Sequence, residues 1–69
     1  MQISDLRTVS SGKHLKFKVD NIDAIGFGMG DKISLLKSGQ LVDLVYNLEL
    51  DVYSGFEKVQ LKVKDIKIK

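Results

Sequence analysis

A short segment of the chain combines cationic and aromatic side chains in a way that suits nucleic-acid chemistry. Four cationic or titratable residues fall within six positions, Lys13, His14, Lys16 and Lys18, and Phe27 follows them. Lysine ammonium groups bind phosphates with release of counterions, and an exposed aromatic ring offers a base a stacking surface. The alternatives are that Lys16 and Lys18 are the solvent-facing side of an ordinary strand, and that a helix covers Phe27.

A second aromatic pair flanks a predicted turn near the C-terminus. Tyr53 and Phe56 lie on either side of Ser54-Gly55, in a chain with five aromatic residues. Two exposed aromatic rings this close together suit stacking on bases. They equally suit docking onto the remainder of a larger protein, as an exposed apolar patch. The sequence leaves both alternatives open.

The residues of the chain do not indicate a metal site, a disulfide or a dinucleotide-binding loop. The absence of cysteine excludes disulfides and thiolate metal sites, and His14 is the only histidine, with no second ligand at a useful spacing. Gly26, Gly28 and Gly30 fail the dinucleotide pattern, because Asp31 occupies its sixth place. These glycines instead favour a tight turn between a strand and a helix. We therefore predict no catalytic residue, no metal site and no cofactor in this chain.

The charge is mildly basic and unevenly distributed. Eleven Lys and Arg against nine Asp and Glu give a net charge of +2, which only hints at a polyanionic partner. Residues 39–57 carry acids but no Lys or Arg, namely Asp43, Glu49, Asp51 and Glu57. Residues 58–69 carry one acid, Asp65, and five lysines: Lys58, Lys62, Lys64, Lys67 and Lys69. The last four lysines form either an extension of a basic track or, as we favour, a solvated face.

Alternation of polar and apolar residues predicts strands and their registers. In the segment 14–19, Leu15, Phe17 and Val19 share one face. A two-residue turn at Asp20-Asn21, where both residues tolerate positive φ, would pair these with Gly26, Ala24 and Ile22 in turn. The outer face would then carry the polar residues of the segment, followed by Asp23, Ile25 and Phe27.

The second predicted hairpin follows the same rule. The inward residues of its first strand are Val42, Leu44, Tyr46, Leu48, Leu50 and Val52. A turn at Ser54-Gly55 would pair Leu50 with Val59, Leu48 with Leu61, Tyr46 with Val63 and, on the outer face, Asp51 with Lys58. A one-residue slip would destroy these matches. A slightly longer loop is the alternative, because Ser-Gly is a less typical turn than Asn-Gly.

The remaining elements complete an all-β layout with one short helix. We expect a first strand over Gln2–Val9 and a helix over Lys32–Ser38, capped by Asp31 and stopped by Gly39. The order β-β-β-α-β-β is that of a five-stranded OB-fold Greek-key barrel. An SH3-like barrel is the alternative, but it has no comparable helix. In OB folds, single-stranded nucleic acid generally lies across the second and third strands and between the loops joining strands 1–2 and 4–5.

Four segments of the chain share features with a known family, namely Gly12–Phe17, Ile22–Gly30, Val42–Gly55 and Val59–Lys67. They resemble the OB domain found toward the C-terminal side of RecJ-type exonucleases specific for single-stranded DNA. Together they cover most of the chain in the right order. In that family an aromatic residue, often tryptophan, precedes the turn of the second hairpin, and Tyr53 holds that place here.

The resemblance implies that residues 1–69 are a single OB-fold domain from a larger, multidomain nuclease. That parent degrades single-stranded DNA from the 5′ end, in repair and recombination, with Mn²⁺ or Mg²⁺ held by separate catalytic domains. None of the catalytic motifs is in this chain, so no catalytic residue is carried over. The expected partners are single-stranded DNA and the parent's catalytic domains, with no small-molecule substrate. The N-terminus lacks the apolar region of a signal peptide and no run approaches a membrane span, so we expect a cytoplasmic domain.

Overall fold

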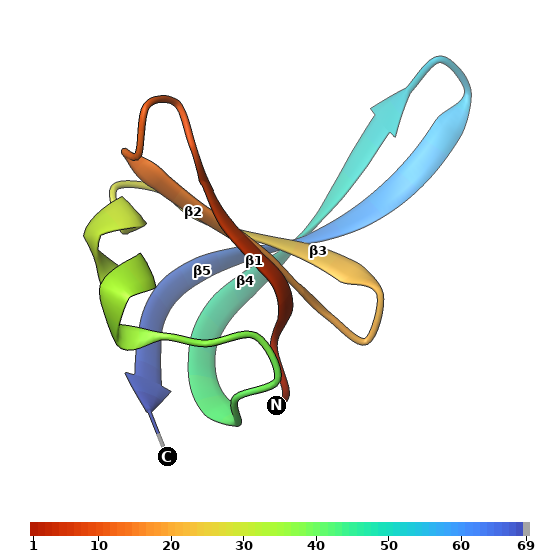
Figure 1. Ribbon diagram of the computed structural model, residues 1–69. Helices are drawn as coiled ribbons and strands as arrows, with labels where there is room; N and C mark the ends of the chain where they lie inside the picture. The colour runs from red at the N-terminus through yellow and green to blue at the C-terminus, as the bar shows by residue number, and fades with distance from the viewer. Residues whose placement is uncertain (69) are drawn as a thin grey trace.

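The computed structural model of the protein describes residues 1–68, with every side chain in that range except that of Tyr53. Its elements are β1 (Ser4–Val9), β2 (His14–Val19), β3 (Ile22–Gly26), the 3-10 helix η1 (Gly30–Leu35), β4 (Val42–Tyr53) and β5 (Phe56–Ile68). Figure 1 shows β4 and β5 as long, bent strands whose shared turn projects away from the rest of the molecule. The outline is accordingly elongated, at 37 × 26 × 18 Å.

The strands form one sheet that closes on itself at one end. Their order is β1-β2-β3-β5-β4, in which β3 and β5 run parallel and the other neighbours antiparallel. Closure occurs where Gln2 bridges Leu41 and the backbones of Met1 and Val42 exchange hydrogen bonds of 2.7 and 2.8 Å. Because η1 lies between β3 and β4, the predicted OB fold is confirmed and the SH3-like alternative is wrong.

β1 is shorter than the predicted strand Gln2–Val9 and begins at Ser4. Its pairing with β2 is irregular just after this residue, where Asp5 adopts a positive φ of 52°. An irregularity of this kind bends a strand. Ser4 still pairs with Lys18 of β2, whereas the Ile3 N–H donates to the Gln40 carbonyl at 3.0 Å. The predicted strand therefore splits into one part paired with β2 and one part that closes the barrel.

Both hairpin predictions are confirmed. In the first hairpin, Asp20 and Asn21 form the turn with φ of 50° and 65°, and the predicted pairs are observed: Leu15 with Gly26, Phe17 with Ala24 and Val19 with Ile22. In the second hairpin, Ser54 and Gly55 form a two-residue turn with φ of 51° and 77°, so the longer loop is not adopted. The predicted partners there are also observed: Tyr46 with Val63, Leu48 with Leu61, Leu50 with Val59 and Asp51 with Lys58.

The core lies between the curved sheet and η1. Its largest fully buried side chains are Phe17, Ile3, Leu15 and Val42. The other buried apolar side chains are Val19, Ala24, Met29, Leu36, Leu61, Val63 and Ile66. The alternating residues of β2 thus occupy the centre of the core, and their polar neighbours are forced to the outside of the barrel.

The prediction that β4 buries one face along its whole length is wrong. Val42 is fully buried and Leu44 is half-buried, but the side chains of Leu48, Leu50 and Val52 are 57–64% exposed. Within the described chain, β4 beyond Val42 pairs only with β5. β3 pairs with β5 only over residues 60–62, and no described strand lies on the other side of β4 at this level, so Leu48, Leu50 and Val52 stay exposed.

The predicted helix is displaced and is of a different type. Instead of an α-helix over Lys32–Ser38, the chain forms the shorter 3-10 helix η1, with Met29 at its N-cap and no side-chain cap from Asp31. The earlier start follows from a backbone hydrogen bond, because the Gly30 N–H donates to the Lys13 carbonyl at 3.0 Å. The helix ends where Leu36 becomes extended and enters the core, before the predicted stop at Gly39. Among the described residues, no helix is long and apolar enough to cross a membrane.

Candidate nucleic-acid interface

The outer face of β2 carries the predicted cationic residues. His14, Lys16 and Lys18 alternate with the buried core residues and are each half-buried. Their stems lie along the sheet while their charged ends reach solvent. Opposite Lys16, the register places Arg7 on β1 and Ile25 on β3. The predicted placement of the β2 lysines on one outer face is therefore confirmed.

Phe27 lies at the end of β3 and is not covered by η1, so the alternative of a covered ring is wrong. Its side chain is 54% exposed. The His14 ring contacts it edge-on, with centroids 5.1 Å apart and an interplanar angle of 75°. The Lys62 ammonium lies 5.5 Å from the ring centroid, within the range of a cation–π interaction. An exposed ring bordered by a lysine has the features of a platform for a base.

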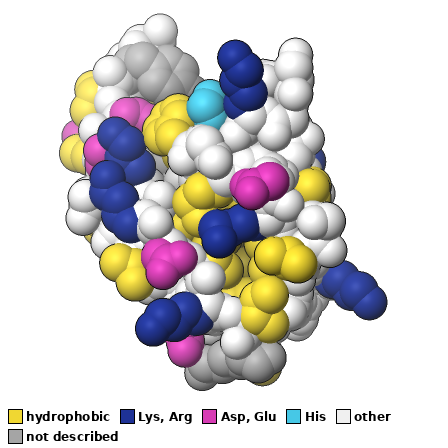
Figure 2. Space-filling model, turned by 90° about the vertical axis from the view of Figure 1, so that its left-hand side faces the viewer, with side chains coloured by type: hydrophobic (Ala, Val, Ile, Leu, Met, Phe, Trp, Pro, Cys, Tyr) yellow, Lys and Arg dark blue, Asp and Glu magenta, His cyan; other side chains and the backbone are white. Residues whose placement is uncertain are grey.

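A hydrogen bond from the loop after Phe27 fixes the orientation of the His14 ring. The Gly28 N–H donates to His14 Nδ1 at 2.9 Å, and Gly28 adopts a φ of +71° that suits glycine. Nδ1 is thus the acceptor, and the Nε2 nitrogen carries the proton in the neutral ring. His14 therefore orients Phe27 by a ring contact and a backbone hydrogen bond. Figure 2 shows the histidine of this face lying against hydrophobic atoms, with lysine or arginine side chains to either side.

Lys62 was not predicted as a site residue. It reaches Phe27 because β3 and β5 pair in parallel, which places Ile25 beside Lys62. The same ammonium lies 3.5 Å from a Glu49 carboxylate oxygen on β4. The sequence indicated only that the last strand is rich in lysine. Finding this contact requires the strand order of the OB fold and the register between β3 and β5.

Asp23 places an acid among the lysines of the face. Its side chain is 13% exposed and forms an ion pair with Lys58. The hydrogen bond from Lys58 lowers the pKa of the Asp23 carboxyl, against a raising effect of burial, and the charges of Lys58, Lys18 and Lys16 lower it further. Asp23 is therefore ionised near neutral pH and offsets part of the positive charge that a phosphate would meet.

The lowered pKa predicts a pH-dependent stability. A carboxyl whose pKa is depressed by folding stabilises the folded state above its unfolded-state pKa, and this contribution is lost as pH falls through the folded pKa. Asp23→Asn is therefore expected to destabilise the protein near pH 7 and to have little effect at about pH 2. Thermal unfolding of both proteins across this range measures the difference. A difference that does not shrink on acidification would contradict the assignment to Asp23 ionisation.

The loop between β1 and β2 borders the face. Lys13 is exposed, and the three residues before it, Ser10, Ser11 and Gly12, all adopt positive φ. The small residues of this loop permit a close approach by the backbone of Gly30. An ideal Cβ at Gly30 would lie 1.8 Å from the Gly12 carbonyl oxygen. Contact with η1 thus holds the Lys13 loop in place.

The second aromatic pair is remote from Phe27. Phe56 is 71% exposed and lies six residues before Lys62 on β5, which at about 3.3 Å per residue corresponds to about 20 Å. Tyr53 pairs with Phe56 through the backbone, and its side chain lies outside the described part of the structure. The two predicted aromatic groups are therefore separate features, and the structure does not bring them together.

Of the other C-terminal lysines, Lys64 and Lys67 are exposed. Lys67 lies five residues beyond Lys62 and opposite Asp43 on β4, whereas Lys69 is outside the described residues. In residues 1–68, no group of three or more His, Asp or Glu side chains could hold a metal ion.

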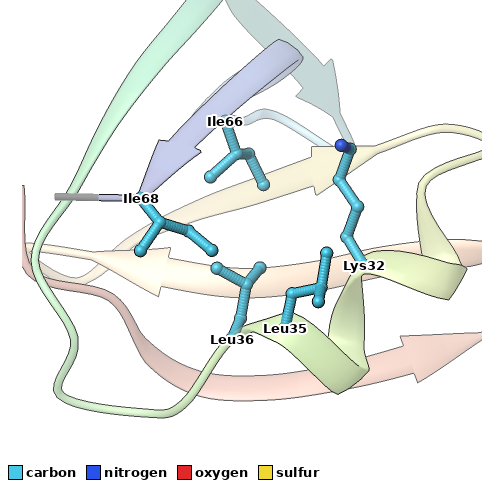
Figure 3. Close-up of a pocket in the computed structure, with 5 residues that line it drawn as sticks. All are labelled: Lys32, Leu35, Leu36, Ile66 and Ile68. Carbon is cyan, nitrogen blue, oxygen red and sulfur yellow. The ribbon is translucent and has the colours of Figure 1, made fainter.

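A shallow apolar pocket lies between η1 and the end of β5. Its lining residues are Lys32, Leu35, Leu36, Ile66 and Ile68, as Figure 3 shows. The four aliphatic side chains point toward one another, and Lys32 lies along the rim. These side chains provide packing between helix and strand but no acid–base pair.

Comparison with known proteins agrees with the fold. A family model described as the RecJ OB domain matches residues 1–65, a range that includes His14, Phe27 and Lys62. Searches of curated proteins and of solved structures found no match. The match covers nearly the whole chain. The chain thus belongs to the RecJ OB domain family, the nucleic-acid-binding modules of RecJ-like proteins.

Proposed function

We propose that this domain binds single-stranded DNA on the outer face of β2, β3 and β5. In this proposal it is a module of a RecJ-type 5′-to-3′ exonuclease that acts in DNA repair and recombination in the cytoplasm. The observation that carries the proposal is the exposed Phe27 ring, bordered by His14 and Lys62 at the end of a lysine-bearing strand. The family match supports nucleic acid as the ligand class.

In the proposed binding mode, the lysines contact phosphates and the Phe27 ring contacts a base. Lys16, Lys18 and the loop residue Lys13 attract the phosphates of the strand. Phe27 stacks on one base, and the positive charge of Lys62 beside the ring adds attraction for the neighbouring phosphate. Stacking and phosphate contacts are available to every nucleotide, so we expect binding with little dependence on base sequence.

The hydrolytic step is assigned in this proposal to catalytic domains outside this chain. Mn²⁺ or Mg²⁺ bound there would activate the water for phosphodiester cleavage. The contribution of the OB domain is to hold the single strand as it is fed to that centre. The expected partners are therefore single-stranded DNA and the parent's catalytic domains.

Fluorescence anisotropy of a labelled oligo-dT tests the proposal directly. An oligonucleotide of about 15 nucleotides lies within the site sizes of OB folds. We expect binding that weakens steeply with salt and that favours single strands over duplex. No binding at high protein concentration would overturn an autonomous DNA-binding function, and equal binding of oligo-U would broaden the ligand to single-stranded nucleic acid in general.

Reversal of the β2 charges is expected to remove two phosphate contacts. For the double variant Lys16→Glu and Lys18→Glu, we expect weaker oligo-dT binding and a salt dependence, log K against log salt, shallower by about 1.4. Both side chains are on the outer face, so the fold should survive. Anisotropy titrations at several salt concentrations measure the change.

Two control variants sharpen this test. Lys37→Glu with Lys67→Glu makes the same change in net charge at exposed positions outside the proposed face, and we expect a smaller loss of affinity. Asp23→Asn removes the acid from the proposed face, and we expect tighter binding. Equal losses in the two double variants would show that net charge alone controls binding and would contradict a defined face.

A second candidate function is a docking domain that shapes the parent's DNA channel without appreciable DNA binding of its own. The exposure of Phe56 beside the β4–β5 turn favours it. In the parent enzyme, alanine at both Tyr53 and Phe56 would then reduce interdomain protection in hydrogen exchange, and unchanged protection would count against docking.

A further inference from the structure

The outer edge of β4 is open along most of its length. β1 reaches this edge only at the bridge between Gln2 and Leu41 and through the hydrogen bonds between Met1 and Val42. In the rest of the described chain, β4 pairs on one side only, with β5. A long unpaired edge presents a row of backbone N–H and C=O groups to any strand that approaches.

The inward face of this edge is apolar and exposed. Leu48, Leu50 and Val52 are 57–64% exposed, and Val59 beside them on β5 is 39% exposed. These side chains belong to the face that forms the core at the other end of the same strands, where Val42 and Val63 are buried. Figure 1 shows this half of the hairpin extending past the barrel, with no other element over it. A strand added to β4 would extend the apolar face with its own alternate side chains.

The opposite face of the same edge is acidic. The outward residues of β4 include Asp43, Glu49 and Asp51, and residues 39–57 contain no Lys or Arg. Native edge strands often avoid unwanted pairing with an outward lysine or with proline. β4 has neither, so its edge is suited to a strand that carries basic residues on that face.

The charge pattern disfavours a second copy of this chain as that strand. In a twofold antiparallel pairing centred on Leu50, Glu49 of one copy would lie directly opposite Asp51 of the other on the same face. Like charges in directly opposite cross-strand positions are destabilising. The acids therefore act against self-association in this register.

The residue pattern of β5 indicates what kind of strand can pair with β4. On the closed side of β4, β5 alternates apolar and polar residues, with Val59, Leu61 and Val63 inward and Lys58, Gln60 and Lys62 outward. Its Lys62 forms an ion pair with Glu49. A strand of the same character on the open side would meet the same inward apolar row and the same outward acids.

We propose that the open edge of β4, over residues 45–52, binds an extended segment of a partner protein in which apolar and basic residues alternate. Backbone hydrogen bonds to the edge would align the segment, as in other cases of strand addition. Its apolar side chains cover Leu48, Leu50 and Val52, and its basic side chains pair with Glu49 and Asp51. This surface is separate from the Phe27 face and goes beyond the proposed DNA binding.

A synthetic peptide of alternating lysine and valine, matched in length to residues 45–52, is a suitable probe. We expect it to protect the β4 amides from hydrogen exchange and to bind more tightly than two controls, a glutamate–valine peptide and a block-sequence peptide of the same lysine and valine content. Protection confined to β2 and β3, or equal binding of the block-sequence peptide, would overturn the proposal, because either result indicates contact without strand addition.

A matched pair of variants tests the face. Leu50→Lys places a charge on the inward apolar row, and Leu35→Lys places the same charge on η1, outside the β4 edge, at similar exposure of 57% and 63%. We expect Leu50→Lys to weaken peptide binding by about tenfold or more, and Leu35→Lys to have a much smaller effect. Equal effects would overturn the assignment of the face, and thermal unfolding verifies that both variants fold.

Two further outcomes separate this proposal from its alternatives. Sedimentation of the chain alone is expected to show a monomer, and a dimer abolished by Leu50→Lys would mean that a second copy occupies the edge. The Lys16→Glu and Lys18→Glu variant should keep its peptide affinity. Loss of that affinity would overturn the separation of the two surfaces, whereas failure of oligo-dT binding leaves the peptide result unaffected.

Discussion

Replacement of Phe27 with alanine is expected to weaken oligo-dT binding by about 1–3 kcal/mol, which is about 5- to 150-fold in Kd. The ring is more than half exposed, so its loss removes a stacking surface without opening the core. It also removes the partner of the Lys62 ammonium and of the His14 ring edge. Anisotropy titration at fixed salt measures the change in affinity, and thermal unfolding verifies the fold.

Two exposed apolar residues provide controls for Phe27→Ala. Leu35→Ala removes a side chain of similar exposure from η1, beside the apolar pocket, and we expect no change in affinity. Phe56→Ala removes a ring about 20 Å along β5, and we expect a smaller loss than for Phe27. If Phe56→Ala weakens binding and Phe27→Ala does not, the DNA platform lies on the β4–β5 hairpin instead.

Replacement of Gly30 with alanine is expected to destabilise the fold by about 3 kcal/mol or more. The added Cβ would lie 1.8 Å from the Gly12 carbonyl oxygen, 2.7 Å from the Gly12 carbonyl carbon and 2.9 Å from that of Lys13. All three are backbone atoms, so no side-chain rotation relieves the overlap. The loop and η1 must separate, which breaks the hydrogen bond from Gly30 to Lys13. Denaturant unfolding measures the loss.

Gly12→Ala is the matched control on the other side of the same contact. A Cβ at Gly12 meets nothing within 4 Å, although its φ of +85° disfavours alanine. We therefore expect a cost of only about 1–2 kcal/mol from backbone strain. For a domain of this size, whose total stability is about 3–10 kcal/mol, the two variants should separate clearly. Equal destabilisation would contradict the steric explanation for Gly30.

The candidate site was partly predictable because its strand positions follow from local patterns. The alternation over 14–19 and the Asp20-Asn21 turn were sufficient to place Lys16 and Lys18 outward. The exposure of Phe27 was not predictable, because it depends on where η1 starts. The contact of Lys62 with Phe27 depends on the parallel β3–β5 pairing, whose register no turn residue specifies.

The sequence by itself determined both hairpins. Each has a two-residue turn and an alternating pattern, and a slip of one residue would turn every apolar side chain outward. The OB order also followed from the sequence, because the number of strands and the position of the helical segment are local properties. The predicted pairs from Val19 with Ile22 to Tyr46 with Val63 are those observed.

Only the tertiary structure decided which predicted inward residues are covered. Leu48 and Leu50 alternate as regularly as Leu15 and Phe17, yet they are exposed because β1 bends at Asp5 and reaches β4 only at its start. The helix, likewise, starts where Gly30 packs against the β1–β2 loop, not where its own sequence offers a cap. Alternation records which side chains share a face, whereas burial of that face depends on elements distant in sequence that the pattern does not encode.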